Sequence, residues 1–138
     1  MYEPIRTKSV HTTAGTADFP HRSREEELDI QLAGHLTALL AVTDELRGPE
    51  PSADLDAAAE RLTEQITRLR GGRPPVRVTV TATEHAPRDS TLHLRAHALA
   101  GRALVVAASR ADTAVAILAA ERMDAHTAAA GTRTLTSR

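Results

Sequence analysis

The chain has 138 residues, enough for one compact domain and too few for two cores of ordinary size. Hydrophobic residues make up 41% of it, but 26 residues are alanines, which bury little area each, so we expect a thin core. There is no cysteine, which excludes disulfides, thiolate zinc sites and cysteine nucleophiles. The net charge of −1 is unevenly distributed, with 6 Lys/Arg against 13 Asp/Glu over residues 1–67 and 8 against 2 over residues 68–110.

The N-terminal third of the chain predicts one helix. Residues 1–22 show little periodicity and are predicted to be a flexible lead, with a short strand over residues 5–10 as the alternative. Ser23 and Glu26 have the spacing of a capping box, and leucines then recur at helical spacing until a Gly-Pro pair. This pattern predicts an acidic amphipathic helix within residues 23–50.

The middle of the chain predicts a second helix followed by strands. Ser52 is placed to cap a helix whose apolar residues repeat with a helical period up to Leu69, where two glycines soon follow. Apolar and polar residues then alternate over residues 76–82 and again over 92–98, which predicts two half-buried strands. Residues 103–108 predict a third, more apolar strand, after a turn through a glycine.

The last predicted element is a helix that begins after Asp112 and ends before Gly131, with residues 131–138 as a disordered tail. Together the elements predict an α+β fold, an antiparallel sheet of three to four strands with helices on one face and an extra N-terminal helix. No signal peptide and no run of about 20 apolar residues is present, so we expect a cytoplasmic protein with no membrane partner.

The basic segment is predicted to bind RNA. Alternate residues on a strand share a face, so Arg77 and Arg95 would emerge together from the open side of the sheet. The predicted RNA-binding residues are Arg68, Arg70, Arg73, Arg77, Arg88, Arg95, Arg102 and Arg110. Since Tyr2 and Phe19 are the only aromatic residues, contacts would be to phosphates rather than by base stacking. Two alternatives are a merely solvated basic face and an acidic helix that folds against these arginines and neutralises them.

No catalytic or metal-binding motif stands out. His93 and His97 are four residues apart, but on a strand that spacing spans about 13 Å, too far for two ligands of one ion. The sequence offers no phosphate-binding glycine loop, HExxH-like pair or activated nucleophile. We therefore predict a protein that is not an enzyme and has no cofactor, metal or small-molecule substrate.

Four stretches together resemble the ribosome hibernation-promoting factors, also called ribosome-associated inhibitors or sigma-modulation proteins. They are residues 76–83, Ser90–Leu94, Gly101–Ala107 and the run Asp112–Ile117, within a matched region of about residues 52–130. The resemblance implies a β-α-β-β-β-α fold that binds ribosomal RNA of the small subunit and represses translation during dormancy or stress. Two features depart from that family: the last helix has a single arginine, Arg122, before residue 130, and the acidic helix has no counterpart.

The alternative function is a homodimeric regulatory or protein-interaction module of similar fold without RNA binding. The thin core favours this alternative, because a second copy can cover apolar surface that one chain cannot bury. Salt dependence distinguishes the two, since phosphate binding weakens steeply with salt and an apolar interface hardly responds.

Overall fold

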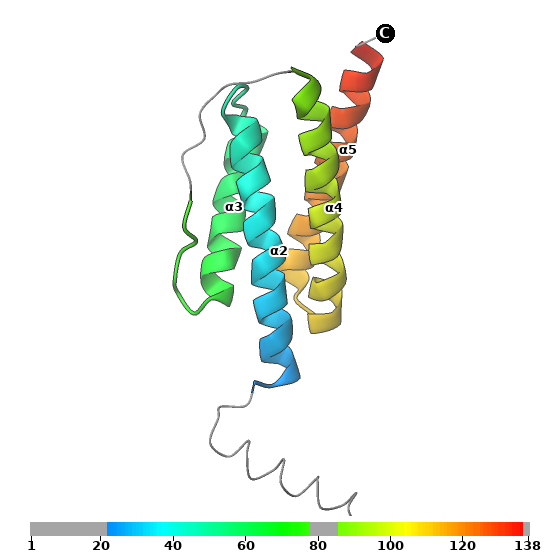
Figure 1. Ribbon diagram of the computed structural model, residues 1–138. Helices are drawn as coiled ribbons and strands as arrows, with labels where there is room; N and C mark the ends of the chain where they lie inside the picture. Colours follow the sequence, from blue (N-terminus) through cyan, green and yellow to red (C-terminus); the bar gives the residue numbers. More distant parts are fainter. Residues whose placement is uncertain (1–21, 78–85, 137–138) are drawn as a thin grey trace, which may run out of the picture.

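The computed structural model describes residues 22–77 and 86–136, with the backbone alone for residues 86–89 and 132–136. The described chain is all-helical (Figure 1). Its helices are α2 (Arg24–Arg47), α3 (Ala53–Leu69), α4 (Ala86–Arg110) and α5 (Thr113–Thr136). No strand occurs in these residues, so the predicted α+β fold with its antiparallel sheet is wrong.

The first two helices begin where the capping residues predict. Ser23 Oγ accepts a hydrogen bond from Glu26 N (3.1 Å), and Ser23 N donates one to Glu26 Oε1 (2.8 Å), which completes the capping box of α2. Ser52 Oγ likewise accepts from Leu55 N (3.1 Å) at the start of α3. These side chains satisfy backbone N–H groups that have no partner within the helix. Both predicted helices are therefore confirmed.

The predicted second and third strands, residues 92–98 and 103–108, both lie within α4. The buried residues of this helix recur at spacings of one, three and four, which places them on one side of it: Leu92, His93, Ala96, Leu99, Ala100, Ala103 and Ala107. Leu94 and Ala98, which the strand interpretation buried, are on the outside of the bundle, with Leu94 63% exposed. Alanine explains the error, because its frequent occurrence makes short alternating patterns by chance, whereas its backbone preference is for helix over strand.

The other ends of predicted elements also need correction. Val76 and Arg77, at the start of the first predicted strand, are irregular, and the rest of that strand lies outside the described residues, as does the possible strand at residues 5–10. α5 continues through Gly131 to Thr136, so it does not end before Gly131 as predicted.

Two similar turns end α3 and α4. Gly71 (φ 70°) follows α3 and Ala111 (φ 61°) follows α4, both in the left-handed conformation. In each turn the next residue donates its N–H back to the helix, from Gly72 to Thr67 O and from Asp112 to Ala107 O (both 2.8 Å). This is the Schellman arrangement, which satisfies free carbonyls at a helix end. Alanine carries a steric strain in this conformation that glycine does not.

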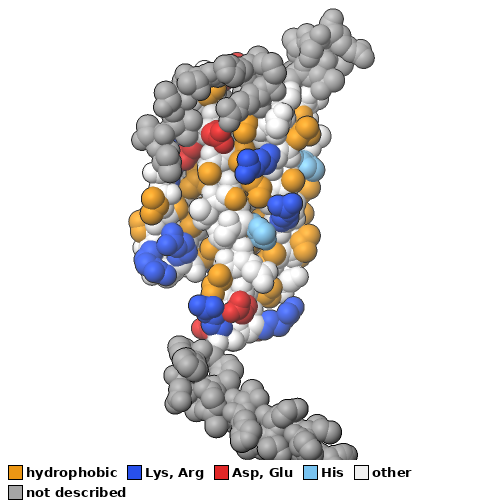
Figure 2. Space-filling view, in the orientation of Figure 1, with side chains coloured by type: hydrophobic (Ala, Val, Ile, Leu, Met, Phe, Trp, Pro, Cys, Tyr) orange, Lys and Arg blue, Asp and Glu red, His pale blue; other side chains and the backbone are white. Residues whose placement is uncertain are grey.

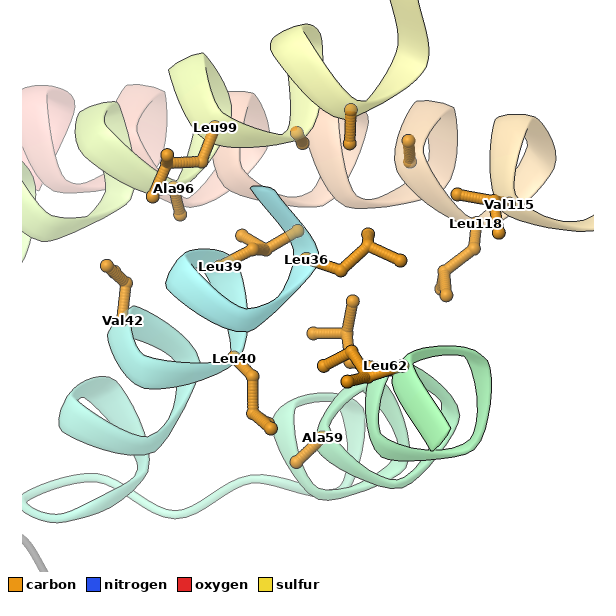
Figure 3. Packing of buried hydrophobic residues seen from close by; sticks show 14 of the residues in the cluster. Leu36, Leu39, Leu40, Val42, Ala59, Leu62, Ala96, Leu99, Val115 and Leu118 are labelled. Carbon is orange, nitrogen blue, oxygen red and sulfur yellow. The ribbon is translucent and has the colours of Figure 1, made fainter. Parts of the chain in front are cut away.

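The helices form two hairpins that meet along α2. The α2–α3 hairpin and the α4–α5 hairpin pack together mainly through α2 and α4, whereas α3 and α5 approach each other only narrowly. Figure 3 shows Leu40 of α2 directed towards α3 and Leu39 towards α4. Leu36, Leu39 and Leu40 are almost fully buried. The leucines of α2 therefore supply a large part of the core. α4 contributes mostly alanine, which lets α5 lie close to it, and α5 contributes Val115, Leu118 and Ala119.

We expect truncation of a central leucine to be severe. Leu36 has no exposed surface, so Leu36→Ala should lower the free energy of unfolding by about 2–5 kcal/mol. A control lies two residues away: Gly34 is exposed and helical, and a Cβ added to it would meet nothing within 4 Å, so Gly34→Ala should raise the free energy of unfolding by roughly 0.5–1 kcal/mol. Urea unfolding followed by circular dichroism measures both, and a loss below about 1 kcal/mol for Leu36→Ala would contradict this packing.

Candidate functional site

Three of the predicted RNA-binding arginines are neutralised within the protein. Arg77 donates hydrogen bonds to both carboxylate oxygens of Asp44 on α2 (2.7 and 3.1 Å). These hydrogen bonds are the main cause that raises the pKa of Arg77. Arg110 pairs with Asp29 of α2 (3.0 Å). Arg68 pairs with Asp112 (2.8 Å). For Arg77 and Arg110 the described contacts thus match the alternative in which the acidic helix folds against the basic segment.

The other predicted arginines do not form one surface. Arg70 and Arg73 donate to backbone carbonyls in the loop after α3, and Arg88 lies in the first turn of α4, where only the backbone is described. Arg95 and Arg102 are exposed and form no ion pair with described residues. They are seven residues apart, hence on one edge of α4. Figure 2 accordingly shows separate basic spots with apolar side chains between them rather than a continuous basic strip.

An open pocket of roughly 270 Å³ lies where α2, α3 and the α4–α5 turn meet. Its lining residues are Asp29, Arg68, Arg110, Ala111, Asp112 and Thr113. Both guanidinium groups in it are already paired with its two carboxylates, at 2.8 and 3.0 Å. The pocket therefore offers little net charge to attract an anion.

A chain of buried polar side chains crosses the interface between α3, α4 and α5. Arg122 on α5, of whose side chain 4% is exposed, pairs through Nη1 with both oxygens of Asp54 at the start of α3 (3.1 and 3.2 Å). Its Nη2 lies 3.4 Å from Nε2 of His126, which is one turn further along α5. His126 Nδ1 lies 2.9 Å from Nδ1 of His93 on α4. Arg122 Nε is buried with no hydrogen-bond partner among the described atoms.

The direction of hydrogen bonding in this chain is fixed by the arginine. A guanidinium group can only donate, so Nε2 of His126 must accept. Neutral His126 then carries its proton on Nδ1 and donates it to Nδ1 of His93, which in turn carries its proton on Nε2. Arg122, His126 and His93 therefore form a one-way relay of hydrogen bonds, with each imidazole held in a single tautomer.

A proton added to His126 has no favourable place in this arrangement. Burial lowers the pKa of His126 from 6.5 to about 3, and the positive charge of Arg122 adds to the effect. At neutral pH both the burial and the hydrogen-bond directions thus favour the uncharged ring. The relay joins α4 and α5 in the interior, and Arg122 also reaches the exposed carboxylate of Asp54 on α3, so this geometry suits a structural role in fixing how α5 lies against α3 and α4.

Among the described residues, the histidines form no metal site with other ligands. The strand argument against His93 and His97 fails, because on α4 these two residues are one turn apart and their Cβ atoms are about 6 Å from each other. Yet nowhere in the described ranges do three His, Cys, Asp or Glu side chains gather in a way that could hold a metal ion. The pair His93 and His126 alone leaves a metal short of protein ligands.

The exposed side of the α4–α5 hairpin carries three of the five large apolar side chains that are exposed in the described residues, and we call it the outer face. Leu94 is 63% exposed and Val105 is 67% exposed, and these residues, 11 apart, lie on one side of α4. Exposed Ala98 lies between them. On α5, Ile117 is 53% exposed and lies on the side away from the core. The outer face consists of Leu94, Ala98, Val105, Ala108, Ile117 and Asp124 with the neighbouring Arg95, Arg102 and Glu121.

Sequence reasoning missed both the relay and the outer face. A helical period over residues 92–107 would have shown the outer face: Leu92, Ala96 and Leu99 follow a buried stripe, and Leu94 falls off it. Arg122 and His126 occupy one side of α5 four residues apart, which is also the side of buried Leu118. The contact between His93 and His126 had no local signal, because 33 residues separate them.

Comparison of the chain with models of known protein families, with curated proteins and with solved structures finds no match. The resemblance to hibernation factors stays a prediction from short stretches of sequence. Within residues 22–77 and 86–136, none of the helices is long and apolar enough to cross a membrane.

The relay predicts a pH dependence of stability. In the unfolded state His126 binds a proton below about pH 6.5, whereas in the folded state it stays neutral down to about pH 3. The unfolded state is therefore increasingly favoured as the pH falls between these values. The contribution of His126 to the free energy of unfolding should fall by roughly 1.4 kcal/mol for each pH unit by which the pH is lowered in that window, and it should stay constant above the window. The difference between wild type and His126→Gln in urea unfolding from pH 4 to 8 measures it. The control is His35→Gln on α2, whose free energy of unfolding should depend on pH as steeply as that of the wild type. If the free energy of unfolding of His126→Gln also depends on pH as steeply as that of the wild type, the assignment is refuted.

Proposed function

We propose that this protein is a non-catalytic helical module that works by associating with a second copy of itself. The observation that carries the proposal is the outer face, where Leu94, Val105 and Ile117 are each more than half exposed. Exposed apolar side chains that gather on one surface mark an interaction site more often than scattered ones do. A two-fold dimer would use each of them twice and would enlarge the thin core of one chain.

The titratable groups also favour association over catalysis. The buried ones, Arg122, His126 and His93, are engaged with one another. The charged groups around the polar pocket are paired. A catalytic acid or base would need an open position where it can reach a substrate, and the relay is closed within the core.

Binding to ribosomal RNA has less support than self-association. Its physical basis was a sheet face with arginines side by side, whereas the described residues form no sheet and Arg68, Arg77 and Arg110 are paired with carboxylates. Arg95 and Arg102 remain as exposed cations on α4 that pair with no carboxylate in the described ranges. Two cations give a small electrostatic contribution to phosphate binding.

The oligomeric state tests the proposal. Light scattering behind size exclusion should give a mass near twice the 14.8 kDa of one chain at high protein concentration. Leu94→Glu with Val105→Glu should give a monomer that keeps its helical content, because both side chains are exposed and their loss leaves the core intact. Ala57→Glu, at an exposed position of α3, is the matched control and should dimerise normally.

Two results would refute self-association. One is a wild-type protein that stays monomeric at every concentration at which it is soluble. The other is a double variant that dimerises as the wild type does. Co-sedimentation with small ribosomal subunits at low salt, lost steeply as salt rises, would instead support the RNA-binding alternative.

A further inference from the structure

The charges beside the outer face have opposite signs on its two helices. Between residues 90 and 109, α4 has Arg95 and Arg102 as its charged residues and no carboxylate. Between residues 113 and 131, the exposed charges of α5 are Glu121 and Asp124, since Arg122 is buried. One helix of the face is therefore basic and the other acidic. A dimer that places α4 on the partner's α4 would bring like charges together, whereas α4 on the partner's α5 pairs opposite charges.

The register within one chain predicts which charges would meet. α4 and α5 are antiparallel, and two contacts fix their relative height: a Cβ at Gly101 would lie 3.6 Å from Met123 Cε, and His93 touches His126. Counting along the helices from these contacts places Arg102 level with residues 117–122 and Arg95 level with residues 124–129. Val105 falls level with residues 114–119, a range that includes Ile117. A two-fold axis parallel to the helices keeps these heights unchanged between subunits.

We infer that two copies pack outer face to outer face about a two-fold axis parallel to the helices, with α4 of each copy against α5 of the other. In this arrangement Arg102 meets the partner's Glu121, Arg95 meets the partner's Asp124, and Val105 packs beside the partner's Ile117. The apolar side chains supply the affinity and the charges select the orientation. This inference rests on the proposed self-association and adds to it the arrangement of the two copies.

Glu121 can take part without losing its place in the fold. It already pairs with Arg61 of α3 (2.6 Å), but its side chain is 52% exposed and a carboxylate accepts several hydrogen bonds. Asp124 is exposed and forms no ion pair with described residues. The small size of Ala98 on the outer face allows a second helix to approach closely.

A complementation experiment with two charge-reversed variants tests this arrangement. The first variant carries Arg95→Glu and Arg102→Glu on α4, and the second carries Glu121→Lys and Asp124→Lys on α5. Each alone should self-associate roughly tenfold more weakly than wild type at low salt, because every charge pair in its dimer becomes repulsive. A mixture of the two should form a heterodimer of near wild-type affinity. In this heterodimer the reversed α4 faces the reversed α5 and the unchanged α4 faces the unchanged α5, so both contacts avoid the like-charge repulsion of the two homodimers. Native mass spectrometry resolves the heterodimer from both homodimers.

The outcomes separate this arrangement from self-association itself. Arg24→Glu, and Glu60→Lys with Glu64→Lys, are exposed charge reversals outside the outer face and should leave dimerisation unchanged. If both variants dimerise like wild type, the arrangement is refuted while the proposed function stands. If the α4 variant instead forms a heterodimer with wild type that is tighter than the wild-type homodimer, α4 meets α4 and the arrangement is again refuted. A monomeric wild type would refute both.

Discussion

The burial of the leucines of α2 is the interaction on which the fold depends. This helix lies between α3 and α4, and its buried residues extend around much of its circumference because it packs against both. The remaining contacts between the two hairpins are much smaller, since α3 and α5 approach only narrowly. Three ion pairs help to hold that narrow contact, from Asp54, Arg61 and Arg68 of α3 to Arg122, Glu121 and Asp112. All three α3 partners are about half exposed or more, so the pairs stabilise the contact only modestly.

Local sequence signals predicted the helices whose ends have strong capping residues. Ser23 with Glu26 and Ser52 mark starts that need no knowledge of the tertiary structure, and bulky leucines in α2 and α3 leave one period that fits. α4 has weaker signals, because alanine and leucine at residues 92–98 fit a strand and a helix equally well over so short a window. Burial decides between them, and burial is a property of the assembled hairpins. The error changed the predicted function too, since the basic face existed only on a sheet.

The ion pairs show why charge counts along a chain predict a surface poorly. The segment 68–110 has a large excess of arginine, yet Arg77 and Arg110 contact Asp44 and Asp29, which are 33 and 81 residues away. At these two contacts the acidic helix neutralises part of the basic segment, as the alternative interpretation of the sequence allowed. The charges that stay exposed on α4 and α5 are a small number of groups beside apolar side chains, a pattern typical of protein interfaces rather than of RNA-binding surfaces.

The hairpin architecture has a consequence for how the chain folds. Each hairpin joins helices that are neighbours in sequence, so its contacts close short loops. The docking of α2 on α4 is the one extensive contact between distant parts of the described chain. We therefore expect rapid folding in which the hairpins form as separate cooperative units and the leucines of α2 join them afterwards. A nascent chain would then reach a nearly native first hairpin before α4 and α5 have been synthesised.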